Sequence, residues 1–112
     1  MAITTPNYSN LNLDEMAASI GLKPKHMPIL IMSFLEESNP ILETLSGAVA
    51  SNDYATIRTS AHSIKGSAGN LRFTEVYDMA KELENAGGNS DTGFDYTGYL
   101  EAIKNAVATI KL

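Results

Sequence analysis

Cysteine is absent from the 112-residue chain, which excludes disulfide bonds, thiolate metal sites and cysteine nucleophiles. No apolar run approaches the roughly 20 residues that span a bilayer, and the first residues lack the basic and apolar regions of an export signal. Positive charge is also scarce, because 13 acidic residues outnumber 8 basic ones and the net charge is −5. Duplex binding needs a basic face. These absences favour a cytoplasmic protein that binds neither membranes nor nucleic acid.

The composition that remains is typical of one globular domain. Hydrophobic residues make up 44% of the chain and charged residues 19%, a balance that supports a packed core. Apolar residues recur at spacings of three and four almost throughout, which is the period of an amphipathic helix. We therefore expect residues 1–112 to form a single all-α domain, of which 1–10 are a flexible N-terminus.

Caps, stops and apolar stripes divide the chain into five predicted helices. Asn12 caps a short helix at 13–20, and Asn52 or Asp53 caps the third helix. The predicted helices are 13–20, 25–50 with a bend at Asn39-Pro40, 53–70, 74 to the Gly87-Gly88 stop, and 96–110, with a surface loop at 87–93. The last four are predicted to form an up-down-up-down antiparallel four-helix bundle over 25–111, with the short segment 11–21 capping one end.

His62 lies on the wrong side of its helix to be a core residue. At about 100° per residue, one narrow arc holds the apolar side chains of the third helix, and His62 lies roughly 130° from the centre of that arc. The residues of the arc are Tyr54, Ile57, Ala61, Ile64, Ala68 and Leu71. The imidazole of His62 is therefore predicted to point to water.

The neighbours of His62 on the helix surface are two cations and two glycines. Arg58 and Lys65 flank the ring at spacings of four and three, while Gly66 and Gly69 follow at four and seven. Glycine in a helix interior costs about 1 kcal/mol relative to alanine, so this face gives up about 2 kcal/mol. Steric clearance for a docking partner would account for that loss.

This patch suits a carrier of phosphate. A neutral imidazole has one nitrogen free as a nucleophile and can form a reversible phosphoramidate. Lys65 and Arg58 could balance the charge of a phosphoryl group. No glycine-rich phosphate loop or kinase motif is present, and Ser63 rather than an acid follows the histidine. We expect no cofactor on this chain, so a partner must bring the Mg²⁺ and the aspartate.

The run from Ala61 to Leu71 resembles the H-x-[LI]-K-G-[SA]-[SA] signature of histidine phosphotransfer (HPt) domains, and the likeness covers about 25–111. The resemblance implies that His62 accepts a phosphoryl group from the aspartate of a receiver domain and passes it to another receiver. It implies that Lys65 and Gly66 assist charge balance and close approach. The partners would be receiver domains of hybrid histidine kinases and response regulators, with the chain itself a monomer.

Arg72 departs from the family pattern, which usually has glycine ten residues after the histidine. It could reshape the turn between the third and fourth helices or add a cation that contacts the partner. The chain would then differ from its family in receiver choice rather than in carrier chemistry.

The sequence also allows three alternatives to a free-standing carrier to be compared with its residues. A kinase dimerisation domain is disfavoured, because it would carry an acid beside the histidine and an ATP-binding domain after it. The HPt fragment of a chemotaxis-type histidine kinase and a non-catalytic helical interaction module stay open.

His26 is interpreted as a surface residue, and neither histidine has the neighbours of a metal site. The charges at Glu36-Glu37 and at Lys81, Glu82 and Glu84 are interpreted as solvated helix faces.

Overall fold

The computed structural model describes residues 3–111, and every regular element in that range is a helix or a 3-10 turn. The elements in chain order are α1 (Leu13–Ser19), the 3-10 turn η1 (Pro24–His26), α2 (Met27–Ser51), α3 (Tyr54–Asn70), α4 (Thr74–Gly88) and α5 (Tyr96–Ala108). No strand is present within those residues. None of these helices is long and apolar enough to cross a membrane.

Side-chain caps begin three of the helices. An oxygen of Asn12, Asp53 or Asp95 accepts a hydrogen bond from the backbone N–H three residues later, at 3.1, 3.2 and 2.9 Å respectively. Such a cap is worth about 1 kcal/mol. The cap at Asn12 is confirmed, and Asp53 rather than Asn52 caps α3. Asn52 instead ends α2 in the left-handed conformation.

The second helix continues through Pro40 as one element of 25 residues, as predicted. It begins at Met27 and not at 25, because Pro24–His26 form a separate 3-10 turn immediately before it. Its buried side chains recur every three or four residues along one face. Pro40 is exposed and lies on the other side of the helix. Proline has no backbone N–H to donate, and here the missing donor is on the solvent side. The proline therefore interrupts the hydrogen-bond ladder without dividing the helix.

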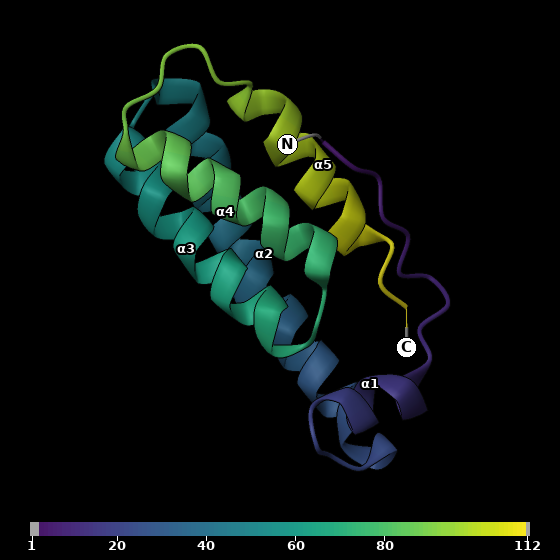
Figure 1. Cartoon of the computed structure of the whole chain (residues 1–112). Coiled ribbons are helices and arrows are strands. Elements are labelled where there is room, and N and C mark those ends of the chain that lie inside the picture. Colours follow the sequence, from purple (N-terminus) through teal and green to yellow (C-terminus); the bar gives the residue numbers. More distant parts are fainter. Residues whose placement is uncertain (1–2, 112) are drawn as a thin grey trace.

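Four helices pack around one apolar core. α3 packs against α2 and α4, and α5 packs against α4 and α2, so that α3 and α5 lie diagonally opposite (Figure 1). Successive helices run in opposite directions, and α1 lies at the end of the bundle where α2 begins (Figure 1). The predicted bundle with an additional N-terminal helix is therefore confirmed. The largest fully buried side chains include Ile31, Leu45, Ile57, Met79 and Leu83.

The N-terminal segment was expected to be flexible over 1–10, of which residues 1–2 lie outside the described residues. Its part 3–10 runs alongside α5 in Figure 1. The ring of Tyr8 lies 4.6 Å from that of Phe73, measured between centroids. The backbone N–H of Tyr8 donates to Oγ1 of Thr109 at 2.8 Å. Burial, together with the charge of Glu75, raises the pKa of Tyr8 to about 12. The segment thus contributes contacts to the α4–α5 side of the bundle that the sequence did not predict.

Candidate functional site

His62 lies in the middle of α3, and its side chain is 67% exposed. The opposite face of the same helix buries Ile57, Ala61, Ile64 and Ala68 in the core. The outward orientation predicted from the helical angle is therefore confirmed. The ring stands on a rigid element, because α3 packs along its length against both neighbouring helices.

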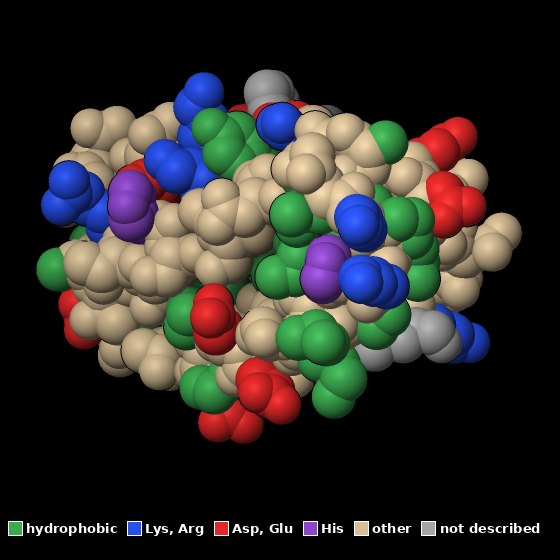
Figure 2. Space-filling view, turned by 90° about the horizontal axis from the view of Figure 1, so that it is seen from below, with side chains coloured by type: hydrophobic (Ala, Val, Ile, Leu, Met, Phe, Trp, Pro, Cys, Tyr) green, Lys and Arg blue, Asp and Glu red, His purple; other side chains and the backbone are tan. Residues whose placement is uncertain are grey.

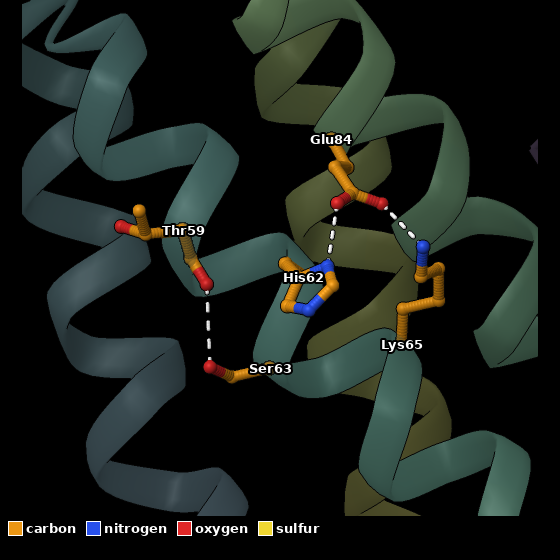
Figure 3. A network of polar contacts seen from close by, with 5 residues as sticks. All are labelled: Thr59, His62, Ser63, Lys65 and Glu84. Atoms are coloured by element: carbon orange, nitrogen blue, oxygen red, sulfur yellow. Dashed lines mark hydrogen bonds and ion pairs between the residues drawn. The ribbon is translucent and has the colours of Figure 1, made fainter.

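Glu84 of α4 joins His62 to Lys65 (Figure 3). Its Oε2 lies 2.6 Å from Nδ1 of His62, and its Oε1 lies 2.6 Å from Nζ of Lys65. The side chains of Glu84 and Lys65 are only 15% and 22% exposed. The interpretation of Glu84 as part of a solvated helix face is thus wrong, since its carboxylate bridges two residues of the neighbouring helix.

A close approach of α3 and α4 brings Glu84 within reach. A Cβ placed on Gly87 would lie 3.0 Å from the backbone oxygen of Tyr54 and 3.1 Å from the backbone nitrogen of Arg58. Any larger residue at this position would force the two helices apart. α4 ends at Gly88, so the predicted stop at Gly87-Gly88 is confirmed, although both glycines belong to the helix and the loop begins at the C-cap Asn89 rather than at 87. A glycine pair at the end of an apolar stripe was the available sequence signal, but it also fits a helix stop.

The contact with Glu84 determines which nitrogen of His62 carries the proton. The hydrogen bond from Lys65 lowers the pKa of the Glu84 carboxyl, partial burial opposes this, and the hydrogen bond from His62 lowers it further. The net shift is downward, so the carboxyl is ionised at neutral pH and can only accept hydrogen bonds. Nδ1 must then be the donor. In the neutral ring the lone pair is then on Nε2, which points away from Glu84 (Figure 3).

The two glycines near His62 have different surroundings. A Cβ on Gly66 would meet no atom within 4 Å, so the space above it is open. Gly66 and Ser67 line a shallow hollow beside His62, whose far wall is formed by Glu37 and Ile41 of α2. A Cβ on Gly69 would lie 3.1 Å from Cδ2 of Tyr77. Gly69 therefore accommodates a side chain of α4, and its role in partner clearance stays a prediction.

The predicted cations do not all converge on the ring. Lys65 is engaged by Glu84, as described above. The side chain of Arg58 extends toward the end of α4, where its Cδ lies 3.3 Å from the position of a Cβ on Gly88. The surface view shows blue basic side chains next to each of the two purple histidines (Figure 2). Of the predicted cations, only Lys65 has an observed link to the His62 ring.

Arg72 occupies the turn between α3 and α4 with a φ of 63°. Its N–H donates to the oxygen of Gly69 at 3.2 Å, and the N–H of Phe73 donates to that of Ala68 at 3.0 Å. These are the two hydrogen bonds of a Schellman turn, in which the left-handed position is usually glycine. A side chain there costs roughly 1–2 kcal/mol. The turn therefore keeps its regular course and is not reshaped as Arg72 had suggested; the left-handed arginine instead adds strain.

Comparison with protein families gives one match. The sequence model described as the Hpt domain matches residues 30–111, most of the chain and all of α3, α4 and α5. No curated protein and no solved structure gives a significant match. Within residues 3–111, no three His, Asp or Glu side chains are grouped so that they could hold a metal ion.

Proposed function

Because the chain belongs to the Hpt domain family, we propose that it accepts a phosphoryl group on Nε2 of His62 from a receiver domain and passes it to a second receiver. One observation carries this proposal. The 2.6 Å contact between Nδ1 and the Glu84 carboxylate holds the proton on Nδ1 while the ring itself stays exposed. Members of this family are phosphocarriers in two-component signalling rather than classical enzymes.

The transfer balances as a displacement at phosphorus. The lone pair of Nε2 attacks the phosphorus of the receiver's aspartyl phosphate, and the bond from phosphorus to the aspartate oxygen breaks. The aspartate carboxylate leaves with the electron pair of that bond. Nδ1 keeps its proton, so the phosphorylated ring is a cation whose charge faces Glu84. Lys65, beside the same carboxylate, offsets part of the negative charge that the phosphoryl group brings.

The partner is expected to supply what this chain does not. Phosphoryl transfer normally needs Mg²⁺ held by carboxylates, and we expect the receiver to bring both the ion and the phosphorylated aspartate. The receivers would be those of hybrid histidine kinases and of response regulators, and the exchange would take place in the cytoplasm with a monomeric carrier. The open space above Gly66 would let a receiver loop approach the ring.

A transfer assay tests the proposal. Receiver domains phosphorylated with acetyl phosphate and Mg²⁺ are mixed with the protein, and transferred phosphate is tested for acid lability and alkali stability. We expect at least one receiver to label the protein, with the phosphate mapped by mass spectrometry to the peptide that contains His62. Labelling only by an ATP-fed kinase domain would favour the chemotaxis-type fragment. No labelling of a protein shown to be folded would favour an interaction module.

Replacing Glu84 with alanine should slow acceptance of phosphate roughly tenfold. A hydrogen bond to a charged group contributes about 1.5–3 kcal/mol, enough to shift the tautomer balance by that factor when it is lost. Glu84→Gln should retain most of the rate, since the amide oxygen can still accept from Nδ1. Imidazole ¹⁵N shifts should report a proton on Nδ1 in the wild type and in Glu84→Gln, but a mixture of tautomers in Glu84→Ala. Glu101→Ala removes a negative charge from an exposed site on α5 and should leave the rate unchanged.

Replacing Gly66 with alanine should stabilise the protein and impair its function. The new methyl group meets open space, so the unfolding free energy should rise by about 0.5–1 kcal/mol. The same methyl group would obstruct an approaching receiver, and displacement of the reacting atoms should slow transfer by about tenfold. Gly47→Ala is the matched control, because Gly47 also lies in a helix with no atom near its missing Cβ. Equal transfer rates for both variants, measured with the same receiver, would contradict the role of Gly66.

A further inference from the structure

Arg72 is the one bulky residue among the left-handed positions of the described chain. The other residues with positive φ are Gly21, Asn52 and Ser90. Each of them also follows or ends a helix, and each has a small side chain or none. Local backbone chemistry therefore favours a small residue at the turn after α3 as well. The presence of arginine there requires a reason outside the turn.

No contact among the described residues 3–111 supplies that reason. Arg72 is exposed, and no hydrogen bond or ion pair with a residue in 3–111 engages its guanidinium. It lines a surface groove of about 480 Å³ between the C-terminal half of α3 and the N-terminal half of α4. Lys65 and Gly66 line the same groove at its other end, so the groove begins beside the His62 site and ends at Arg72.

The distance of Arg72 from His62 decides whether its side chain could contact the transferred phosphoryl group or a docked partner protein. From His62 to Asn70, the last residue of α3, the helix rises about 12 Å at 1.5 Å per residue, and Arg72 lies beyond that end in the turn. A phosphoryl group bonded to Nε2 occupies only the first few ångströms above the histidine. Arg72 is thus placed to contact a docked protein at a second point and not the group being transferred.

The chemistry of the groove specifies the kind of contact. An unpaired guanidinium binds a carboxylate through two parallel hydrogen bonds. Lys65 is already engaged by Glu84, and Asp78 further along the groove would repel a second carboxylate. The favoured position for an anionic side chain is therefore the Arg72 end. Since the chain carries a net charge of −5, a local cation is also what would offset its repulsion of an acidic receiver.

We propose that Arg72 binds an acidic side chain on the receiver, outside its phosphorylation pocket, and thereby determines which receivers exchange phosphate with His62. This inference rests on the proposed phosphocarrier function. Arg72 is a specificity-determining residue in this scheme and takes no part in the displacement at phosphorus. The contact would act at the rim of the interface, where a charge chiefly changes the association rate.

The test compares Arg72→Gly with the wild type across a panel of receiver domains phosphorylated by acetyl phosphate. For the receiver that the wild type prefers, kcat/KM should fall about fivefold to tenfold, while the rate at saturating receiver changes less than about twofold. The difference should shrink as salt is raised. Arg72→Lys should be intermediate, because lysine keeps the charge but lacks the fork of donors. Relief of backbone strain should raise the Tm of Arg72→Gly by about 3–6 °C, which excludes unfolding as the cause of its slower transfer.

Two controls separate this proposal from the carrier function. Lys104→Ala also removes one positive charge, from α5, which does not pack against α3, and should change kcat/KM less than about twofold. Phosphoramidate, a small donor with no protein surface, should label the wild type and Arg72→Gly equally. Equal kcat/KM for Arg72→Gly and the wild type with every receiver, or equal losses in Arg72→Gly and Lys104→Ala, would overturn the role of Arg72 alone. A wild type that accepts phosphate from no receiver would overturn both proposals.

Discussion

Substitution of His62 with glutamine is expected to reduce phosphoryl acceptance from every receiver to background while leaving the protein folded. Glutamine has no nucleophilic nitrogen, because its amide lone pair is delocalised. The side chain is 67% exposed and the glutamine amide can still donate to Glu84, so the unfolding free energy should fall by no more than about 1 kcal/mol. Transfer of phosphate from labelled receivers and thermal unfolding, measured on the same preparation, test the two parts together.

His26→Gln is the matched control for this experiment. His26 is the other histidine of the chain, and it is also exposed, at the end of the turn before α2. Basic side chains lie next to both histidines (Figure 2), so the two variants lose the same group from the surface, and only His62 also loses a contact with Glu84. His26→Gln should accept phosphate at the wild-type rate. Acid-labile phosphate on His62→Gln, or loss of phosphate from His26→Gln alone, would show that His62 is not the carrier.

The helices could be predicted from the sequence because their signals are local. Side-chain caps act over three residues and apolar stripes over a few turns, so the predicted ends at 20 and 50 differ by one residue from those at Ser19 and Ser51. The orientation of His62 follows from the same arithmetic, since it depends only on the angle around its own helix. The pair Gly87-Gly88 fits both a helix stop and a close approach of two helices, and the second interpretation was missed.

The partners of the site residues could not be predicted, because they depend on how two helices are placed against each other. Glu84 is separated from His62 by 22 positions, and its carboxylate reaches the ring only through the close approach at Gly87. Tyr77 fills the space beside Gly69 for the same reason. Periodicity identifies which face of α4 is apolar, but not how far α4 is shifted along its axis relative to α3. Sequence patterns thus singled out the proposed nucleophile, His62, and missed Glu84, the residue that contacts its ring.

Phe73 shows the same limit in the core, and its replacement with alanine should have the largest effect on stability. The residue lies between α3 and α4, outside any helical stripe, yet it is only 2% exposed. Its ring lies 4.6 Å from that of Tyr8 and 5.1 Å from that of Phe34, measured between centroids. Removing a buried phenyl ring costs about 3–5 kcal/mol, from lost burial and from the cavity that remains. We expect this loss in urea unfolding.

A second aromatic substitution and a double-mutant cycle would test why Phe73→Ala should lose so much unfolding free energy. Phe94→Ala removes a half-buried ring and should cost about half as much or less, since only part of its surface leaves water on folding. Tyr8→Ala, combined with Phe73→Ala, should give a coupling energy of about 0.5–1.5 kcal/mol, as aromatic pairs usually do. Strict additivity would mean that Tyr8 contributes nothing through this contact. A positive coupling would establish the segment 3–10 as part of the folded domain, because its aromatic ring would then stabilise the core around Phe73.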